Sequence, residues 1–144
     1  MTVTIRDATA LDAPAIAALL AELDHPASET EIRARLERLA LAGPGDRVLV
    51  AVTDGRVAGM AVLHETPMLH RPTDVGRVTA LVVRADVRGR GIGAALVRAA
   101  EDILAARGCA RLEITSAHTR AHPFYRRAGY ADEGVRFARK LPRP

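Results

Sequence analysis

Apolar residues near the N-terminus recur every three or four positions, which is the spacing of one face of an α-helix. The first such stretch follows the start signal Thr9-x-x-Asp12 and ends before His25-Pro26. The second opens with Ser28-x-x-Glu31, the pattern of a capping box, and stops at the glycines of residues 43–45. We therefore predict two consecutive helices. Their apolar positions are Ile16, Leu19, Leu20 and Leu23, and then Ile32, Leu36 and Leu39.

Shorter apolar runs that are rich in β-branched residues predict strands. Asp54-Gly55 separates two of these runs and is a turn signal for a β-hairpin. We predict a polar, proline-bearing loop over residues 65–74, with His64 beside it and His70 within it. The strands predicted in this half of the chain span residues 3–6, 48–52 and 57–63.

The stretch from Val78 to Val97 changes its pattern twice. Its first six residues predict a strand, a basic and glycine-rich loop follows, and helical spacing resumes at Gly91. Gly108 is placed to end that helix as a left-handed cap, and residues 112–115 predict another strand. The whole unit is strand–helix–strand, so we expect its two strands to lie parallel.

The C-terminal region predicts a short helix over residues 118–128, ended by Gly129. Tyr130 and residues 135–140 predict closing strands, in a hairpin about residues 132–134. Helices and strands therefore alternate along most of the chain. The pattern predicts an α/β (α+β) fold with a mixed sheet.

Composition narrows the class of protein. The 144 residues are 49% hydrophobic with a formal net charge of +4, which fits a single domain over residues 1–144. Only Lys140 is lysine among 21 basic residues, and the arginines are spread along the chain. With 3% aromatic residues, a nucleic-acid surface is disfavoured. The single cysteine and an N-terminal apolar run that ends at Glu22 predict a cytoplasmic protein without membrane partners.

The loop between strand and helix predicts a phosphate or pyrophosphate site. Gly89, Gly91 and Gly93 let successive backbone N–H groups converge at a helix N-terminus, where the dipole favours negative charge. Arg88 and Arg90 add positive charge and bidentate donors. No Lys-Ser/Thr follows the last glycine, which argues against a P-loop. Residues 89–94 fit a dinucleotide fingerprint loosely, which leaves a nicotinamide-dependent oxidoreductase open, although length and topology disfavour it.

Two motifs resemble one family. Arg88-x-x-Gly91-x-Gly93, placed after an apolar strand, is similar to the coenzyme A pyrophosphate loop of the GNAT superfamily of N-acetyltransferases. Residues 121–130, Ala-His-Pro-Phe-Tyr-Arg-Arg-Ala-Gly-Tyr, resemble the superfamily's A-x-x-F-Y-x-x-x-G-F/Y helix. The resemblance implies the GNAT fold. This fold has about four helices and a mostly antiparallel sheet of six to seven strands that splays at one parallel pair.

The resemblance also implies acetyl-CoA as the cofactor, bound between the splayed strands. Backbone groups of the first strand would bond the pantetheine arm, and the glycine loop would cradle the pyrophosphate. Tyr125 would be the general acid that protonates the departing thiolate. Phe124 and Tyr125 cannot point the same way on one helix, and we expect Tyr125 in the site. The cofactor-binding residues implied are Leu81, Val82, Val83, Arg88, Gly89, Arg90, Gly91, Ile92, Gly93, Ala94 and His118.

Two positions depart from the family pattern. Many members carry a carboxylate as general base on the first splayed strand, where Thr79 and Ala80 stand here. His118 occupies a place where many members have asparagine. The base therefore stays open. We favour solvent or a water chain, and His118, His70 and Glu113 are the other candidates.

The function implied by the resemblance is N-acetyltransfer from acetyl-CoA to a primary amine, by direct transfer and without a metal. The acceptor is set by loops that vary in the family, here the loop of residues 65–74 and the segment around His25. A small-molecule amine and a protein amino group both stay open as acceptor, and so does a homodimer. The alternative is a non-catalytic acyl-CoA-binding or regulatory domain of the same fold.

Overall fold

The computed structural model describes residues 1–116 and 121–144. Within them, five strands form one sheet in the order β1-β2-β3-β4-β5. Strands β1 to β4 pair with one another antiparallel, and β4 and β5 are the one parallel pair in the described residues. The strands are β1 (Thr4–Asp7), β2 (Arg47–Thr53), β3 (Arg56–Thr66), β4 (Val75–Val83) and β5 (Leu112–Ile114).

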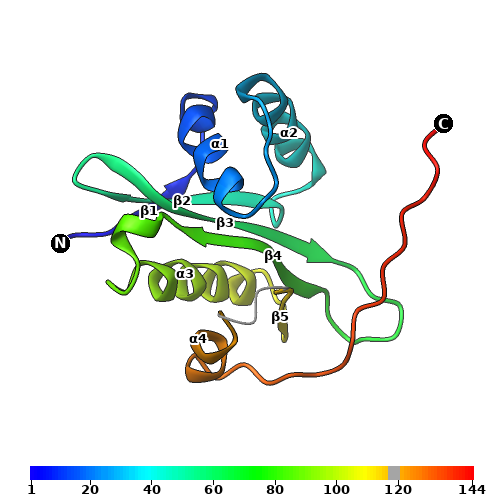
Figure 1. The fold of residues 1–144 in the computed structure, drawn as a ribbon. Coiled ribbons are helices and arrows are strands. Elements are labelled where there is room, and N and C mark those ends of the chain that lie inside the picture. The colour runs from blue at the N-terminus through cyan, green and yellow to red at the C-terminus, as the bar shows by residue number, and fades with distance from the viewer. Residues whose placement is uncertain (117–120) are drawn as a thin grey trace.

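Helices cover both faces of this sheet (Figure 1). The pair α1 and α2 lies on one face, while α3 and α4 lie on the other, with α3 nearer to the sheet. This arrangement confirms the predicted mixed α/β fold. No helix in the described ranges is both long and apolar enough to cross a membrane. The helices are α1 (Ala13–Glu22), α2 (Glu29–Ala42), α3 (Ile92–Ala106) and α4 (His122–Arg127), with 3₁₀ turns at Ala10–Asp12 and Ala85–Val87.

The local signals for turns and caps are confirmed. The N–H of Glu31 donates to Ser28 Oγ at 3.1 Å, and the N–H of Ser28 donates to the Glu31 carboxylate at 3.1 Å, which completes the capping box before α2. Asp54 and Gly55 have φ angles of 50° and 74°, as the tight hairpin between β2 and β3 requires. Gly129, with a φ of 95°, follows the end of α4.

Pairing between β3 and β4 corrects the predicted loop. Glu65 pairs with Gly76 and Thr66 pairs with Val75, so the strands extend past His64 and begin before Val78. The connecting loop therefore shortens to residues 67–74, because each strand provides hydrogen-bond partners for the other. The predicted helix over residues 118–128 appears as α4, which begins at His122, and its expected first residue, His118, lies outside the described residues.

The prediction of six to seven strands was wrong. Residues 130–144 contain no strand, and they run as an extended segment past the end of β5 (Figure 1). The segment follows α4, and two ion pairs hold its start in place. Asp132 pairs with Arg126, and Glu133 pairs with Arg111. Its large apolar side chains, Val135 and Phe137, are 79% and 91% exposed. An alternating pattern forms a strand only when a neighbouring edge can bury its apolar side, and the apolar side chains of this segment stay exposed.

Candidate functional site

An irregularity in β4 decides which backbone groups reach the site. The pairing with β3 shifts between Val62 and Leu63, which pair with Ala80 and Val78, so Thr79 is an extra residue in β4. Side chains change faces at this point. Val78 packs in the core under α3, whereas Ala80 and Val82 pack in the core under α1 and α2.

The bulge also redirects backbone polar groups. The N–H of Arg84 donates to the carbonyl of Ala58 on β3 at 2.7 Å. Polar groups of successive residues in an antiparallel strand point to alternate sides, so those of Val83 and Leu81 point away from β3. All three residues of β5 pair with β4, at Gly76, Arg77 and Val78. In the described residues the pairing ends at Val78. Leu81 and Val83 therefore present backbone groups to the side on which the two parallel strands separate.

The glycine loop lies at the end of the same strand. Gly91 is the N-cap of α3 with a φ of 83°, and Gly89 has a φ of 79°, so both positions use the left-handed region. A Cβ atom at Gly91 would meet nothing within 4 Å, so the space above the helix terminus is open. The first-turn N–H groups, those of Ile92, Gly93 and Ala94, have no acceptor within the helix. The loop thus offers the cradle for an anion that its sequence predicts.

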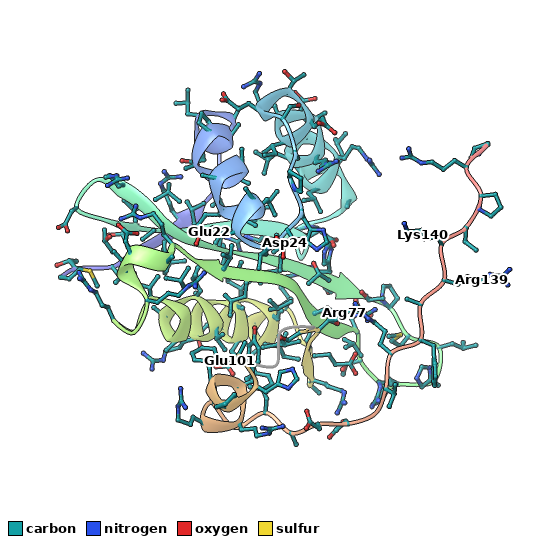
Figure 2. The ribbon with its side chains drawn as sticks, in the orientation of Figure 1. Glu22, Asp24, Arg77, Glu101, Arg139 and Lys140 are labelled. Carbon is teal, nitrogen blue, oxygen red and sulfur yellow. The ribbon has the colours of Figure 1, made fainter. Side chains whose placement is uncertain are left out.

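The two arginines of the loop lie in different surroundings. Arg88 turns back toward β4, where its Nε donates to the carbonyl oxygen of Val83 at 3.0 Å and its Nη2 lies 3.2 Å from Glu22 Oε1. Glu22 stands at the end of α1 next to the sheet (Figure 2). The guanidinium of Arg88 therefore covers one of the backbone groups that face the gap. Arg90 is exposed to solvent.

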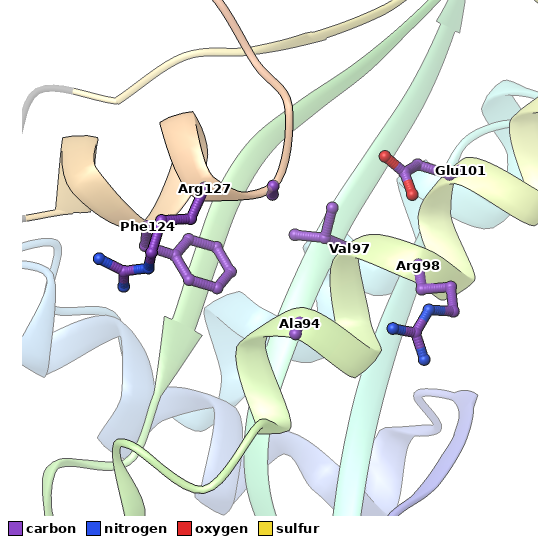
Figure 3. Close-up of a pocket in the computed structure, with 7 residues that line it drawn as sticks. Ala94, Val97, Arg98, Glu101, Phe124 and Arg127 are labelled. Carbon is purple, nitrogen blue, oxygen red and sulfur yellow. The ribbon is translucent and has the colours of Figure 1, made fainter.

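Phe124 docks α4 onto the start of α3. A Cβ atom at Gly93 would lie 3.4 Å from the Cζ atom of Phe124, so the glycine leaves room for the ring. The two helices enclose a pocket of about 410 Å³ beside this contact (Figure 3). The pocket adjoins the glycine loop through Ala94 but includes no residue of β4. Its lining residues are Ala94, Val97, Arg98, Glu101, Phe124, Arg127 and Ala128.

Tyr125 points to a different place from Phe124. Its hydroxyl forms a hydrogen bond with Ser116, in the segment that follows β5. Burial raises the pKa of the Tyr125 phenol above its usual 10, and the hydrogen bond with Ser116 opposes that shift. The ring meets Phe124 and Tyr130 edge-on, with centroids 5.2 Å and 6.5 Å away. Tyr125 thus lies on the β5 side of the gap, with its phenol held protonated at neutral pH.

The three predicted candidates for a general base, Glu113, His70 and His118, have different environments. Glu113 accepts a hydrogen bond from Arg111 Nε at 2.9 Å, and this contact holds the pKa of the carboxyl below its usual range. His70 is exposed in the loop between β3 and β4. His118 lies outside the described residues. Glu113 is therefore engaged as an acceptor, and neither its contacts nor the position of His70 favours a role as base.

Sequence reasoning missed His64. Its Nδ1 lies 2.8 Å from Asp46 Oδ1, and its Nε2 lies 2.9 Å from Oγ1 of Thr79, the bulged residue of β4. Asp46 precedes β2 and is 18 residues away in the chain. The only signal in the sequence was a histidine at the end of an alternating strand, which is also typical of a surface residue. The contact depends on strand register and could not be read from spacing.

Comparisons with known proteins agree with this fold and indicate its family. The sequence profile of the family described as the acetyltransferase (GNAT) family matches residues 14–130. An aminoalkylphosphonate N-acetyltransferase of Salmonella typhimurium strain LT2 is 33% identical over 141 residues, covering 95% of this chain and 90% of that protein. Glucosamine 6-phosphate N-acetyltransferase 1 of Oryza sativa subsp. japonica is 37% identical over 113 residues, covering 76% of this chain and 68% of that protein.

Solved structures match the fold over its whole length. A glucosamine-6-phosphate N-acetyltransferase from Arabidopsis thaliana superimposes with a TM-score of 0.86 at 19% identity, covering 99% of this chain and 100% of that one. A putative acetyltransferase from Agrobacterium tumefaciens strain C58 gives a TM-score of 0.82 at 27% identity, covering 96% and 99%. The chain belongs to the GNAT acetyltransferase family and is an N-acetyltransferase of that family.

Proposed function

We propose that the protein transfers the acetyl group of acetyl-CoA directly to the primary amine of a small molecule. The observation that carries this proposal is one juxtaposition. The backbone groups of Leu81 and Val83 face the gap between β4 and β5, and β4 leads directly into the open N-terminus of α3 at Gly91. An elongated ligand with an anionic end would bond along the strand and place its phosphates on the helix terminus.

Each part of this arrangement has a role in binding acetyl-CoA or in the transfer. Bound acetyl-CoA supplies the thioester that the amine attacks. The first-turn N–H groups of α3 hold the pyrophosphate, and Leu81 and Val83 hold the pantetheine arm through backbone hydrogen bonds. Arg88 releases the carbonyl of Val83 when the arm occupies the gap, and its guanidinium becomes available to the pyrophosphate. The backbone N–H groups that face the gap also stabilise negative charge that develops on the thioester oxygen.

Tyr125 is the proposed general acid. Its phenol is protonated at neutral pH, because burial raises its pKa, and it lies on the far side of the gap from β3. From there its hydroxyl gives a proton to the departing thiolate. A phenol whose pKa is raised by burial faces a thiol with a pKa near 8.5, so the transfer is uphill before hydrogen bonding lowers the cost.

The proposed acceptor is a small amine that carries an anionic group. Both curated relatives are named for acceptors that combine an amine with a phosphonate or phosphate group. Arg77, labelled near the start of β4 in Figure 2, lies directly across from His64. Its guanidinium can pair with such an anion. A protein amino group as acceptor lacks comparable support.

Thermal shift and turnover together test the proposal. Acetyl-CoA at a hundred times its Kd should stabilise the fold by about 2.7 kcal/mol, while NAD at the same concentration should have no effect. Release of free thiol should then follow addition of an aminoalkylphosphonate or glucosamine 6-phosphate, and should be much slower with a peptide amine. Stabilisation by NAD alone would contradict the cofactor. Stabilisation by acetyl-CoA without turnover of any amine would favour the non-catalytic acyl-CoA-binding domain.

A further inference from the structure

His64 is held between two polar partners at the edge of the sheet. Its Nδ1 lies 2.8 Å from an oxygen of Asp46, and its Nε2 lies 2.9 Å from the hydroxyl of Thr79. The side chains of His64 and Asp46 are 27% and 17% exposed, so the pair is largely withdrawn from water. Thr79, by contrast, is exposed. The chain of hydrogen bonds therefore runs from a withdrawn carboxylate to a hydroxyl at the surface.

The chemistry of the partners orients the imidazole. A carboxylate can only accept hydrogen bonds, so Nδ1 of His64 carries the proton and donates it toward Asp46. Nε2 is then the unprotonated nitrogen and accepts the hydrogen bond that Thr79 Oγ1 donates. The lone pairs of that hydroxyl remain available to accept an N–H from a molecule at the surface. In this tautomer the unprotonated nitrogen faces Thr79, so His64 can accept a proton from that side.

Few charged groups face His64 from neighbouring elements. Asp46 approaches from the segment before β2, and Arg77 on β4 is its cross-strand partner. Glu113 on β5 pairs with Arg77 in turn, which places one carboxylate beyond the guanidinium. The last turn of α2, which packs near β2, carries no basic residue. Asp46 is thus the charged group in direct contact with the imidazole.

Thr79 stands where the acceptor amine must arrive. It is the bulged residue of β4, two positions before Leu81, the first of the two residues whose backbone groups face the gap. An arm that leaves the helix terminus at Gly91 and follows β4 backward reaches Leu81 last and ends beside the bulge. Thr79 and Ala80 stand at the two positions where the family's carboxylate is expected, and the hydroxyl of Thr79 is not basic. The basic nitrogen lies one hydrogen bond further on, on β3.

We propose that His64 is the general base of acetyl transfer and takes the amine proton through the hydroxyl of Thr79, with Asp46 as a positioning residue. The inference rests on the proposed function. In the step, an N–H bond of the substrate breaks and its electron pair stays on nitrogen. The proton goes to Thr79 Oγ1 while the hydroxyl proton of Thr79 moves to His64 Nε2. The imidazolium returns its proton to water after each turnover, so no further reactant is needed.

The pH dependence of log kcat/KM separates a base from a structural contact. An ammonium ion must lose a proton before it attacks, so wild-type protein should show a break in the neutral range, where an imidazole titrates, and a plateau above it. His64→Gln should lack the break and rise with unit slope toward the pKa of the amine. Its deficit should be roughly 10²–10⁴-fold at pH 7 and shrink by about tenfold per pH unit.

Companion variants keep the test decisive if His64→Gln fails to fold. Thr79→Val should reproduce the loss of the break, and Thr79→Ser, which keeps the hydroxyl, should retain it. Asp46→Asn should lower kcat by at least about tenfold with little change in the KM for acetyl-CoA, since it acts only by positioning the imidazole. Asp102→Asn is the control, because Asp102 is exposed on α3 and has no proposed part in the site, and its profile should equal that of the wild type.

The outcomes distinguish the relay from the proposed function. A break that persists in His64→Gln or in Thr79→Val overturns the relay while leaving N-acetyltransfer intact. A wild-type profile without a neutral break does the same and identifies solvent as the base. Wild-type protein that is stabilised by acetyl-CoA but acetylates no amine overturns the proposed function, and the relay with it.

Discussion

The Cζ atom of Phe124 lies 3.4 Å from the position that a Cβ atom would take at Gly93. This contact joins the two sequence motifs, because Gly93 belongs to the first turn of α3 and Phe124 belongs to α4. It also fixes which of two adjacent aromatic residues packs against α3. With Phe124 on α3, the neighbouring Tyr125 is turned toward Ser116 and the separation between β4 and β5.

Gly93→Val should displace Phe124, since the added methyl groups enter a space that already contains the ring and a Val83 methyl 3.7 Å from the Cβ position. We expect kcat to fall by at least about tenfold, because α4 carries Tyr125, and a small misplacement of a catalytic group has large effects. Steady-state kinetics with acetyl-CoA measures the loss. Phe124→Leu relieves the crowding, so the double variant should be more active than the two single effects predict. Strict additivity would show that the two sites are not coupled.

Gly91→Val tests the anion cradle. Valine strains the left-handed backbone by roughly 1–2 kcal/mol but meets no atom within 4 Å, so the protein should fold. Its side chain would enter the space expected for the pyrophosphate, and the thermal shift with acetyl-CoA should disappear. Gly108→Val is the matched control, because Gly108 has a φ of 93° and equally open surroundings at the other end of α3. If both variants respond to acetyl-CoA like the wild type, the cradle does not bind it.

Tyr125→Phe tests the general acid. We expect kcat to fall by roughly 10²–10⁴-fold with the KM for acetyl-CoA little changed, because only the proton transfer is lost. Burial raises the pKa of Tyr125, so the alkaline decline of the wild-type kcat should begin at a higher pH than for an ordinary tyrosine. The pH profile of kcat between 6 and 11 would measure both effects. Unchanged turnover in Tyr125→Phe would mean that water protonates the thiolate.

Asp12→Asn tests the anchor of α1. Asp12 is buried and accepts hydrogen bonds from Arg6 at 2.8 and 2.9 Å and from the N–H of Thr9 at 2.8 Å. The Arg6 contact, which is the largest cause, holds the pKa of the carboxyl below its usual range, and burial opposes it. The variant should lose about 1–2 kcal/mol of unfolding free energy at pH 7, a figure that allows for the exposure of Arg6.

The sign of its pH dependence follows from that lowered pKa. The contribution of Asp12 is present above the pKa of an unfolded aspartate, near 4, and is lost as pH falls through the lower folded value. The difference between wild type and Asp12→Asn should therefore shrink below about pH 4 in urea unfolding. Asp102→Asn, at an exposed site on α3, should stay within about 0.5 kcal/mol of the wild type. A difference for Asp12→Asn that is constant down to pH 2 would exclude the ionised contact.

The sequence by itself determined the features that depend on a few consecutive residues. The capping box at Ser28 and Glu31, the hairpin turn at Asp54-Gly55 and the left-handed glycine at the start of α3 are all set by local dihedral angles and local hydrogen bonds. These features, together with helical and alternating spacing, were sufficient to predict the mixed sheet and the strand–loop–helix unit. They were also sufficient to indicate the family.

Tertiary structure decided what depends on register and on partners far away in the chain. Closing strands were predicted at Tyr130 and residues 135–140, but these residues form no strand, because a strand needs hydrogen-bond partners that its own sequence does not supply. The sequence predicts Arg88 as an anion-binding residue, and only the fold shows that its Nε also reaches the carbonyl oxygen of Val83. Thr79 was read as the loss of a base, yet the bulge brings it to His64, and pairing of β3 beside β2 brings His64 to Asp46. A one-residue change in strand register moves every side chain to the other face, so only the folded sheet could assemble these three residues.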